Sequence, residues 1–312
     1  MGKNLIFIPY AYKKGNKTGA NIKSLDKQMD VYLKNCAVAL LSARRYNDKE
    51  TDIAIVTNIE VPEPYASIFR NNGILTIKQE FDNFVFDADC QWSLAFYKLC
   101  ALKAVVTYYG QYEKYAFLDT DVFVQRSFND IWAECDENIM MFDICHGLHV
   151  KLYQNILVEY EKFTGSKKMI THYGGEFFAA NRSNSILFAE ECEKIYWEMK
   201  DKNFNTFYGD EFISSIAADR MKSFIKNSGA YIFRFEISLF LMTCSRYLFN
   251  PVTVLHVPTA KEKGFIRLFD RYYAKGEDPA LNDVYQQLYL SSEPIVLRIK
   301  RYFHKLKGDL QY

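Results

Sequence analysis

Two carboxylates that interrupt an apolar run are the residues of this sequence most able to do chemistry. Asp119 and Asp121 lie two residues apart between Ala116-Phe-Leu118 and Val122-Phe-Val124. An isolated carboxylate is costly in a dry environment, so a buried strand of this composition needs something that compensates both charges. A hard divalent cation held by carboxylate oxygens is the simplest candidate. Because residues i and i+2 of a strand point to one side, we expect both carboxylates to face one ion.

The bulk composition predicts an ordinary globular protein with one large α/β domain and appendages. Of the 312 residues, 49% are hydrophobic and 25% are charged, and 39 basic against 38 acidic residues leave a net charge of +1, which argues against general nucleic-acid binding. Seven scattered cysteines without a CxxC pair indicate free thiols in a reducing compartment. The first apolar stretch, Leu5-Ile-Phe-Ile-Pro9, is too short for a signal peptide, and no run is long enough to span a membrane. We therefore expect a cytoplasmic protein.

The first 124 residues alternate expected strands with expected helices. This alternation predicts a mostly parallel, doubly wound, Rossmann-like sheet flanked by helices. In such sheets ligands bind beyond the carboxyl ends of the strands, where Asp119, Asp121, Thr57 and Asn58 fall. The expected strands are 4–10, 51–58, 74–77 and the segment around Asp119; the expected helices are 26–45 and one capped by Asp87 or Asp89 and stopped by Gly110.

The second half is less regular and ends in a basic helix. A strand around 140–144, a glycine turn feeding a strand over 172–181 and a strand ending at His256 are expected. The expected helices are one over 183–200, capped by Ser183 or Asn184, and one opened by Tyr208-Gly-Asp-Glu-Phe-Ile213. Residues 293–308 place apolar residues on one helical face and Arg or Lys around the rest, a pattern typical of a helix lying on an anionic membrane surface.

Four short segments, in this order, resemble the motifs of nucleotide-sugar glycosyltransferases of the GT-A fold, similar to the glycogenin and lipopolysaccharide galactosyltransferase-like families. They are a DxD motif in Tyr115–Val124, an acceptor-side glycine segment in Gly174–Asn181, a late acidic motif in Gly209–Phe212 and a His…Lys segment in His256–Gly264. The resemblance implies a GT-A catalytic domain over 1–264, with a donor-binding half to about 125 and an acceptor half over 126–264. It leaves 265–312 as a helical, basic, membrane-associating tail.

The resemblance also implies the metal and its ligands. Asp119 and Asp121 would hold a divalent ion, Mn²⁺ or Mg²⁺, that bridges the donor diphosphate. Asp121 is the firmer ligand, whereas Asp119, with Thr120 beside it, contacts metal, ribose or sugar. His256 ends a strand and is either a third ligand, which would favour Mn²⁺, or a structural histidine.

Donor contacts are expected at strand ends and at lysines. Tyr10 or Tyr12 could stack on the base, and Thr57 and Asn58 could hold base and ribose, although strand-end aromatics often only pack. Lys98, on the helix before the DxD motif, is either a phosphate or sugar contact or a solvated lysine. The family's glycine after the motif histidine is replaced here by Pro258-Thr-Ala260, so both Lys261 and Lys263 are candidates for the diphosphate.

The catalytic candidates are all carboxylates. Asp210 and Glu211 together could supply a general base or stabilise an oxocarbenium-like transition state, and the pattern does not separate them. They could also be acids that merely favour the first turn of a helix. Glu176, beside its glycine turn, is a second candidate or a surface residue. Inverting and retaining chemistry both stay open.

Three other classes of protein compete with this interpretation. A haloacid-dehalogenase-like phosphatase would use Asp119 as a covalent nucleophile, but that motif normally opens a chain. A nucleotidyltransferase needs an arginine in the loop after the first strand, and Lys13-Lys-Gly-Asn-Lys-Thr-Gly19 lacks one. A non-catalytic peripheral membrane module leaves the acidic pair unexplained. We therefore expect a cytoplasmic glycosyltransferase on the inner membrane surface, which transfers sugar from a UDP-sugar to a glycan or lipid-linked glycan in polysaccharide biosynthesis.

Overall fold

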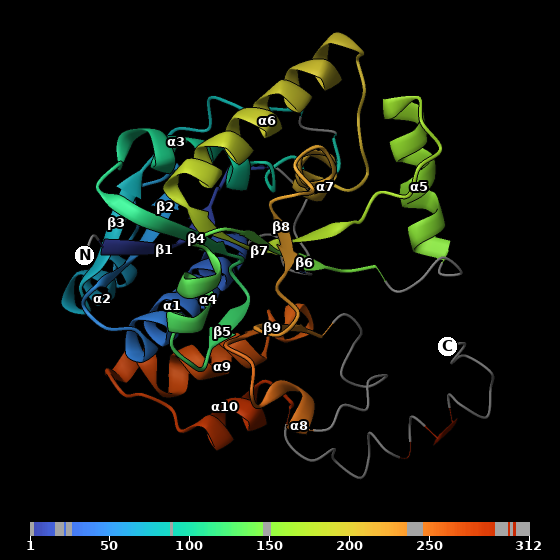
Figure 1. Ribbon diagram of the computed structural model, residues 1–312. Coiled ribbons are helices and arrows are strands. Elements are labelled where there is room, and N and C mark those ends of the chain that lie inside the picture. Colours follow the sequence, from blue (N-terminus) through green and yellow to red (C-terminus); the bar gives the residue numbers. More distant parts are fainter. Residues whose placement is uncertain are drawn as a thin grey trace.

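The protein is built around one large mixed sheet, shown by a computed structural model that describes residues 3–15, 22, 27–87, 90–145, 151–235, 246–290, 299 and 302–303 (Figure 1). The strands are β1 Lys3–Tyr10, β2 Thr51–Thr57, β3 Ile74–Lys78, β4 Tyr112–Leu118, β5 Val122–Val124, β6 Ile139–Asp143, β7 Tyr173–Asn181, β8 Ile225–Asn227, β9 Ile232–Arg234 and β10 Val254–His256. The helices are α1 Gln28–Tyr46, α2 Tyr65–Asn71, α3 Tyr97–Tyr108, α4 Asn129–Glu134, α5 Lys151–Thr164, α6 Arg182–Asp201, α7 Asp210–Arg220, α8 Arg246–Phe249, α9 Gly264–Arg271 and α10 Leu281–Gln287. Short 3₁₀ turns cover Pro258–Ala260 and Tyr273–Lys275.

The large sheet has seven strands in the order β3-β2-β1-β4-β7-β6-β8. The first four strands of the chain pair in parallel, as the alternating pattern predicted, and β7 enters antiparallel between β4 and β6. β1 is almost continuously apolar and buried, as expected for a parallel strand that is covered on both faces. Its neighbours β2 and β4 bring the carboxyl ends of three strands to one edge of the sheet.

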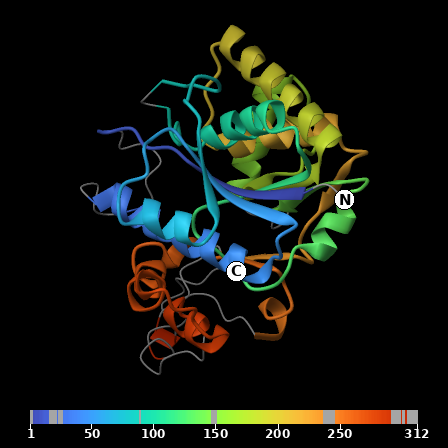
Figure 2. The same cartoon turned by 90° about the vertical axis from the view of Figure 1, so that its left-hand side faces the viewer.

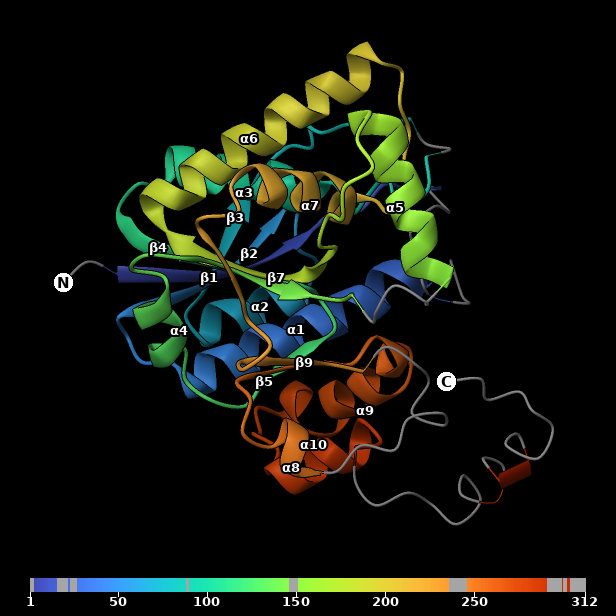
Figure 3. The same cartoon turned by 45° about the vertical axis from the view of Figure 1, so that its right-hand side comes forward.

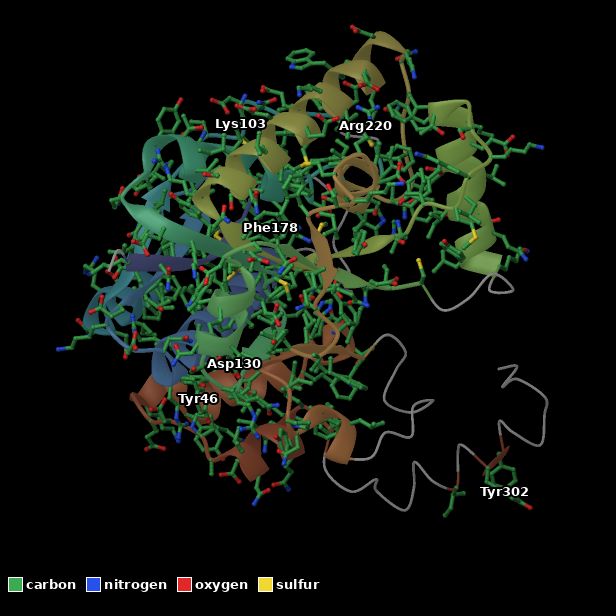
Figure 4. All side chains as sticks on the ribbon, in the orientation of Figure 1. Tyr46, Lys103, Asp130, Phe178, Arg220 and Tyr302 are labelled. Atoms are coloured by element: carbon green, nitrogen blue, oxygen red, sulfur yellow. The ribbon has the colours of Figure 1, made fainter. Side chains whose placement is uncertain are left out.

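Helices cover both faces of this sheet. In Figures 1 and 3, α3, α6 and α7 lie above it, and α1, α2 and α4 lie below it. Successive residues of β1 serve the two faces in turn, since Leu5 and Phe7 pack in the core on the α3 side while Ile6 and Ile8 pack in the core on the α1 side. Phe178, labelled in Figure 4, lies in the middle of the sheet, where its ring stacks on Phe117 at 5.4 Å between centroids.

A small second sheet, β5-β10-β9, lies below α1 together with α9 and α10 (Figures 1 and 2). Helix α9 packs on α1 through Phe265, Leu268 and Phe269, which belong to the same apolar core as α1. The boundary expected near residue 264 therefore falls at the start of a helix that shares this core. The basic segment 293–308 lies outside the described residues except for Ile299, Tyr302 and Phe303, which are helical and exposed.

Two helix starts differ from the sequence prediction. The helix expected to follow Asp87 or Asp89 begins only at Tyr97, because Trp92 has a φ of +62°, which a helix cannot contain; Asp89 itself lies outside the described residues. Helix α6 is capped by Asn181 rather than by Ser183 or Asn184. The Asn181 side chain accepts a hydrogen bond from the backbone N–H of Asn184 at 2.8 Å.

In the described part of the chain, none of the helices combines the length and the apolarity that crossing a bilayer requires.

Candidate active site

The acidic pair lies in a turn between two strands rather than inside one strand. After β4, the chain turns at Asp119, Thr120 and Asp121 and then enters β5 of the small sheet. The Asp119 carboxylate accepts a hydrogen bond from the backbone N–H of Thr120 at 2.7 Å, a local bond that competes with strand pairing. The expectation of an unbroken strand was therefore wrong, and the turn, rather than a strand pleat, directs both carboxylates.

A pocket of about 270 Å³ opens over this turn, at the edge where β1 and β4 end. This is the edge at which parallel sheets bind their ligands. Strands of both sheets, helices α1, α3 and α7, and the turns beside them supply its polar and charged lining. These residues are Tyr10, Gln28, Tyr32, Lys98, Asp119, Thr120, Asp121, Glu176, Tyr208, Asp210, Glu211, Arg234, His256 and Lys261. Most of the residues singled out in the sequence thus meet in one place.

Asp119, Asp121 and His256 form a group that could hold a metal ion. One ligand atom from each lies within 4.8 Å of the others. The small sheet brings the distant histidine here, because β10 pairs with β5 so that His256 lies opposite Val122, the residue after Asp121. Both carboxylate oxygens of Asp121 are buried, and Oδ1 has no hydrogen-bond partner, whereas Oδ2 faces Lys261 Nζ at 3.2 Å. A buried unsatisfied oxygen and a set of two carboxylates and one imidazole fit a divalent ion such as Mn²⁺.

Two cations of the protein itself partly compensate Asp121. Lys261 Nζ lies 3.2 Å and His256 Nε2 3.6 Å from Asp121 Oδ2. Burial acts to raise the pKa of Asp121, but Lys261 and His256 outweigh it and hold the pKa well below its usual range. Burial would likewise lower the pKa of His256, yet the carboxylates of Asp121 and Glu176 raise it to about 9. Without an ion, Lys261 and protonated His256 therefore balance the ionised Asp121, and a metal held by His256 would have to displace its proton.

Lys98 links the acidic turn to helix α7. Its Nζ lies 3.2 Å from Asp119 Oδ2 and 3.6 Å from Asp210 Oδ2. Burial acts to lower the pKa of Lys98, but the surrounding carboxylates outweigh it and keep the ammonium charged. Gly175 permits this approach, since a Cβ there would lie 2.4 Å from Asp210 Oδ2 and 2.9 Å from Lys98 Nζ. Lys98 is thus an ion-paired residue of the pocket and not a solvated lysine.

Asp210 and Glu211, indistinguishable in the sequence, have opposite environments. Glu211 accepts a hydrogen bond from the backbone N–H of Gly175 at 3.1 Å and pairs with His172 Nε2 at 3.1 Å. Burial acts to raise its pKa, but His172 and Arg234 hold it far below the usual range. Asp210 Oδ2 is buried without a hydrogen-bond partner, and burial, opposed by Lys98, raises the pKa of Asp210 to about 7. Environments that separate two pKa values in this way often mark different chemical roles.

Glu176 is buried behind His256, the candidate metal ligand. Its Oε1 lies 3.6 Å from His256 Nδ1, and its Oε2 lies 2.9 Å from Arg234 Nη1. Burial acts to raise the pKa of Glu176, but Arg234 and His256 outweigh it, so the carboxylate stays ionised. It is therefore not the surface residue that the sequence left open.

Four of the expected donor residues are not among those that line the pocket. Asn58 holds the backbone of Tyr12 through two hydrogen bonds, of 2.9 and 3.0 Å, at the exit of β1. Thr57 is fully buried at the end of β2. Lys263 is exposed, whereas Lys261 is buried beside Asp121, so the structure separates the two lysine candidates in position.

Several pocket residues were not found by sequence reasoning. Gln28 and Tyr32 lie one helical turn apart on α1, and Tyr32 carries Lys261 Nζ 5.0 Å above its ring. Their i, i+4 spacing was a usable signal. Arg234 lies opposite His256 in the register of β9 and β10. Because β9 has only three residues, its sequence offers no pattern that would have marked Arg234. Trp92 and Phe207 also line the pocket, from the turns before α3 and α7.

Comparison with known proteins supports the architecture. No family model matches the sequence, and no curated protein matches it. Among solved structures, the chain is similar to the galactosyltransferase LgtC, solved in complex with donor and acceptor sugar analogues. The two share 14% sequence identity and a TM-score of 0.52 over 81% of this chain and 86% of LgtC. This likeness, with the mostly parallel sheet and the helices on its two faces, shows that the chain has the GT-A fold.

Proposed function

We propose that the protein is a metal-dependent glycosyltransferase that transfers a sugar from a nucleotide-sugar donor, a UDP-sugar, to a glycan or lipid-linked glycan acceptor. The observation that carries the proposal is the Asp119, Asp121 and His256 cluster at the carboxyl edge of the sheet, with the unsatisfied Oδ1 of Asp121 in the wall of a pocket. The fold supports it, since LgtC has the same architecture.

Contacts between neighbouring residues give the pocket an order. The stacked rings of Tyr10 and Tyr32 lie at one end, and Lys261 lies over Tyr32 and beside Asp121. Asp119 follows, and Lys98 connects it to Asp210 at the other end. We assign the base to the tyrosines, the diphosphate to Lys261 and the acidic turn, and the transferred sugar to the space beside Lys98.

The charges of the pocket suit this order. Bound to Asp119, Asp121 and His256, a divalent ion would neutralise charge that develops on the leaving diphosphate. Lys261 adds a fixed positive charge at the same place, within 3.2 Å of Asp121 Oδ2. We assign Asp210 to the reacting centre, because its carboxylate faces the pocket and its pKa of about 7 suits proton transfer near neutral pH. Glu211, held by Gly175 and His172, positions the start of α7.

A panel of nucleotide sugars tests this function directly. The thermal unfolding temperature is measured with UDP-, GDP-, CMP- and dTDP-sugars, each with and without Mn²⁺. We expect a UDP-sugar together with Mn²⁺ to raise it by several degrees more than either alone, because the ion and the donor diphosphate each strengthen the other's binding to the folded state. No metal-dependent shift with any donor would contradict the proposal. Phosphomonoester turnover that is lost in Asp119→Asn would instead support the phosphatase alternative.

Glu176 gives a second prediction, on metal binding alone. A carboxylate behind a ligating histidine fixes its ring, and its removal typically weakens metal affinity by roughly 10- to 100-fold. We expect Glu176→Gln to lower Mn²⁺ affinity to this extent in a calorimetric titration without donor. Glu211→Gln is the matched control, because Glu211 also pairs with Arg234 but is not paired with His256. Equal Mn²⁺ affinity in the two variants would show that Glu176 does not orient His256.

Attachment to an anionic membrane surface through 293–308 stays a prediction from the sequence. Liposome binding that survives removal of residues 290–312 would count against it.

A further inference from the structure

One end of the pocket carries aromatic side chains that the proposed chemistry does not use. Trp92, Phe207 and Tyr208 line the pocket together with Asp210. Trp92 lies in the turns before α3, and Phe207 and Tyr208 lie just before α7. Phe207 is 68% exposed, which is unfavourable for a phenyl ring without a ligand. Aromatic surface gathered at a pocket, beside a few polar groups, is typical of a binding subsite.

The backbone fixes Trp92 against the start of α7. Trp92 has a φ of +62°, an outlier for a bulky residue, and Gly209 has a φ of +58°. A Cβ on Gly209 would lie 2.9 Å from the Trp92 Cβ, so the turn that carries Trp92 is pressed against the residue before Asp210. Strained backbone of this kind persists where the surroundings hold it and gathers at ligand sites. The Trp92 side chain therefore starts against Gly209, the residue before Asp210.

The charges at this end favour a neutral ligand. Lys98 faces Asp119 and Asp210, and Arg234 faces Glu176 and Glu211, so four carboxylates surround two cations there. The cation assigned above to a phosphate is Lys261, beside Asp121. A second nucleotide is therefore a poor occupant of the aromatic end.

A pyranose ring matches both the aromatic side chains and the excess of carboxylates at this end of the pocket. Its hydroxyls can bond to carboxylates and to the Lys98 ammonium, and its less polar face presents C–H groups. The face of an aromatic ring is electron-rich and attracts such polarised hydrogens, while stacking removes apolar surface from water. A carboxylated sugar would meet the Asp210 and Glu211 carboxylates and be repelled.

We propose that Trp92, Phe207 and Tyr208 form an acceptor subsite that stacks on a neutral pyranose at the end of the acceptor glycan. This inference rests on the proposed function, because it takes the Tyr10 end as the donor base site and the Asp210 end as the place where the acceptor hydroxyl arrives. It adds the class of acceptor, a neutral hexopyranoside rather than an acidic sugar or a lipid phosphate.

Saturation-transfer NMR tests the subsite without requiring turnover. The probes are methyl β-D-galactopyranoside, methyl β-D-glucopyranoside and methyl β-D-glucuronide, each added to the full chain with Mn²⁺ and UDP. We expect transfer to the ring protons of at least one neutral glycoside, and several-fold weaker transfer to the glucuronide. Phe207→Ala and Trp92→Ala should each reduce the neutral signal at least about threefold. Trp197→Ala, at a half-exposed indole on α6 outside the pocket, should leave it unchanged.

Two features keep the outcome decisive. Trp92→Ala alters a strained turn and could disturb folding, whereas Phe207 is mostly exposed, so Phe207→Ala leaves the core intact. No transfer to either neutral glycoside in the wild-type protein, or transfer that Phe207→Ala leaves unchanged, overturns the subsite. The thermal shift with Mn²⁺ and UDP-sugar, measured on the same samples, reports on the proposed function separately. A normal shift with no role for Phe207 rejects only the subsite, and an absent shift rejects the function.

Discussion

Asp121→Asn is expected to remove the Mn²⁺-dependent stabilisation by UDP-sugars and to lower kcat/KM by about 10²- to 10³-fold, because a lost charge contact at the departing diphosphate costs about 3–4 kcal/mol of transition-state stabilisation. Asp121 is the fully buried member of the candidate metal-ligand group, and its Oδ1 lacks a hydrogen-bond partner. Calorimetric Mn²⁺ titration and donor-consumption kinetics measure the two effects. Mn²⁺ affinity equal to that of the wild-type protein would contradict the assignment.

The same substitution also affects folding, so it needs two companions. Removing the charge of Asp121 leaves Lys261 and His256 buried without their nearest counter-charge, and breaking a buried pair in this way costs about 3–5 kcal/mol. Adding Lys261→Met should recover part of the unfolding temperature but not Mn²⁺ binding. Asp136→Asn breaks a more exposed pair with Lys114. It should change the free energy of unfolding by no more than about 1 kcal/mol and leave activity unchanged.

Asp210→Asn is expected to stabilise the folded protein at pH 8 and to lose that advantage near pH 4. Burial raises the pKa of Asp210 from 3.8 to about 7, so between these values the folded state holds a proton that the unfolded chain releases. The wild-type protein therefore loses stability as pH rises from about 4 to 7, and above 7 the whole loss is present. The Asp210→Asn protein does not lose this stability, so its advantage over the wild-type protein grows as the pH rises from about 4 to 7.

The size of this effect follows from the shift. Each pKa unit corresponds to about 1.4 kcal/mol, which bounds the gain at about 4 kcal/mol. Lys98 loses one partner in the variant, so we expect less, a rise of a few degrees in unfolding temperature at pH 8. Activity should fall by roughly 10²- to 10⁴-fold, the usual contribution of a group that transfers a proton.

Asp119→Asn supplies a control of opposite sign. Asp119 shares Lys98 with Asp210, but Lys98 outweighs the effect of burial and holds the pKa of Asp119 below its usual value. Its charge therefore stabilises the fold above the unfolded pKa, and Asp119→Asn should lower the unfolding temperature at pH 8 in metal-free buffer. If the stability difference between Asp210→Asn and the wild-type protein were the same at pH 8 as at pH 4, Asp210 would not be held at a raised pKa.

The residues that could be predicted are those whose signal is local. Asp119 and Asp121 stand out because charges interrupt an apolar run, and His256 because a strand ends there. The parallel first half of the sheet follows from the alternation of strands and helices. The turn at the acidic pair was not predictable from the same run, since a side-chain hydrogen bond to Thr120 decides it.

The residues that could not be predicted depend on distant partners. Asp210 and Glu211 are adjacent acids, and their distant partners set them apart: Lys98 on α3 for Asp210, and His172 before β7 and Arg234 on β9 for Glu211. The position of Trp92 depends on a positive φ, which the sequence does not mark for tryptophan. Arg234 owes its place to a pairing with His256 across the small sheet.

The candidate site depends on the register of the three strands in the small sheet. Val122, His256 and Arg234 lie directly opposite one another on its strands. A shift of one residue in either pairing would turn the His256 or Arg234 side chain to the opposite face. A single inserted or deleted residue within β5, β9 or β10 would therefore displace the candidate ion ligand His256 or Arg234, which pairs with Glu176 behind it.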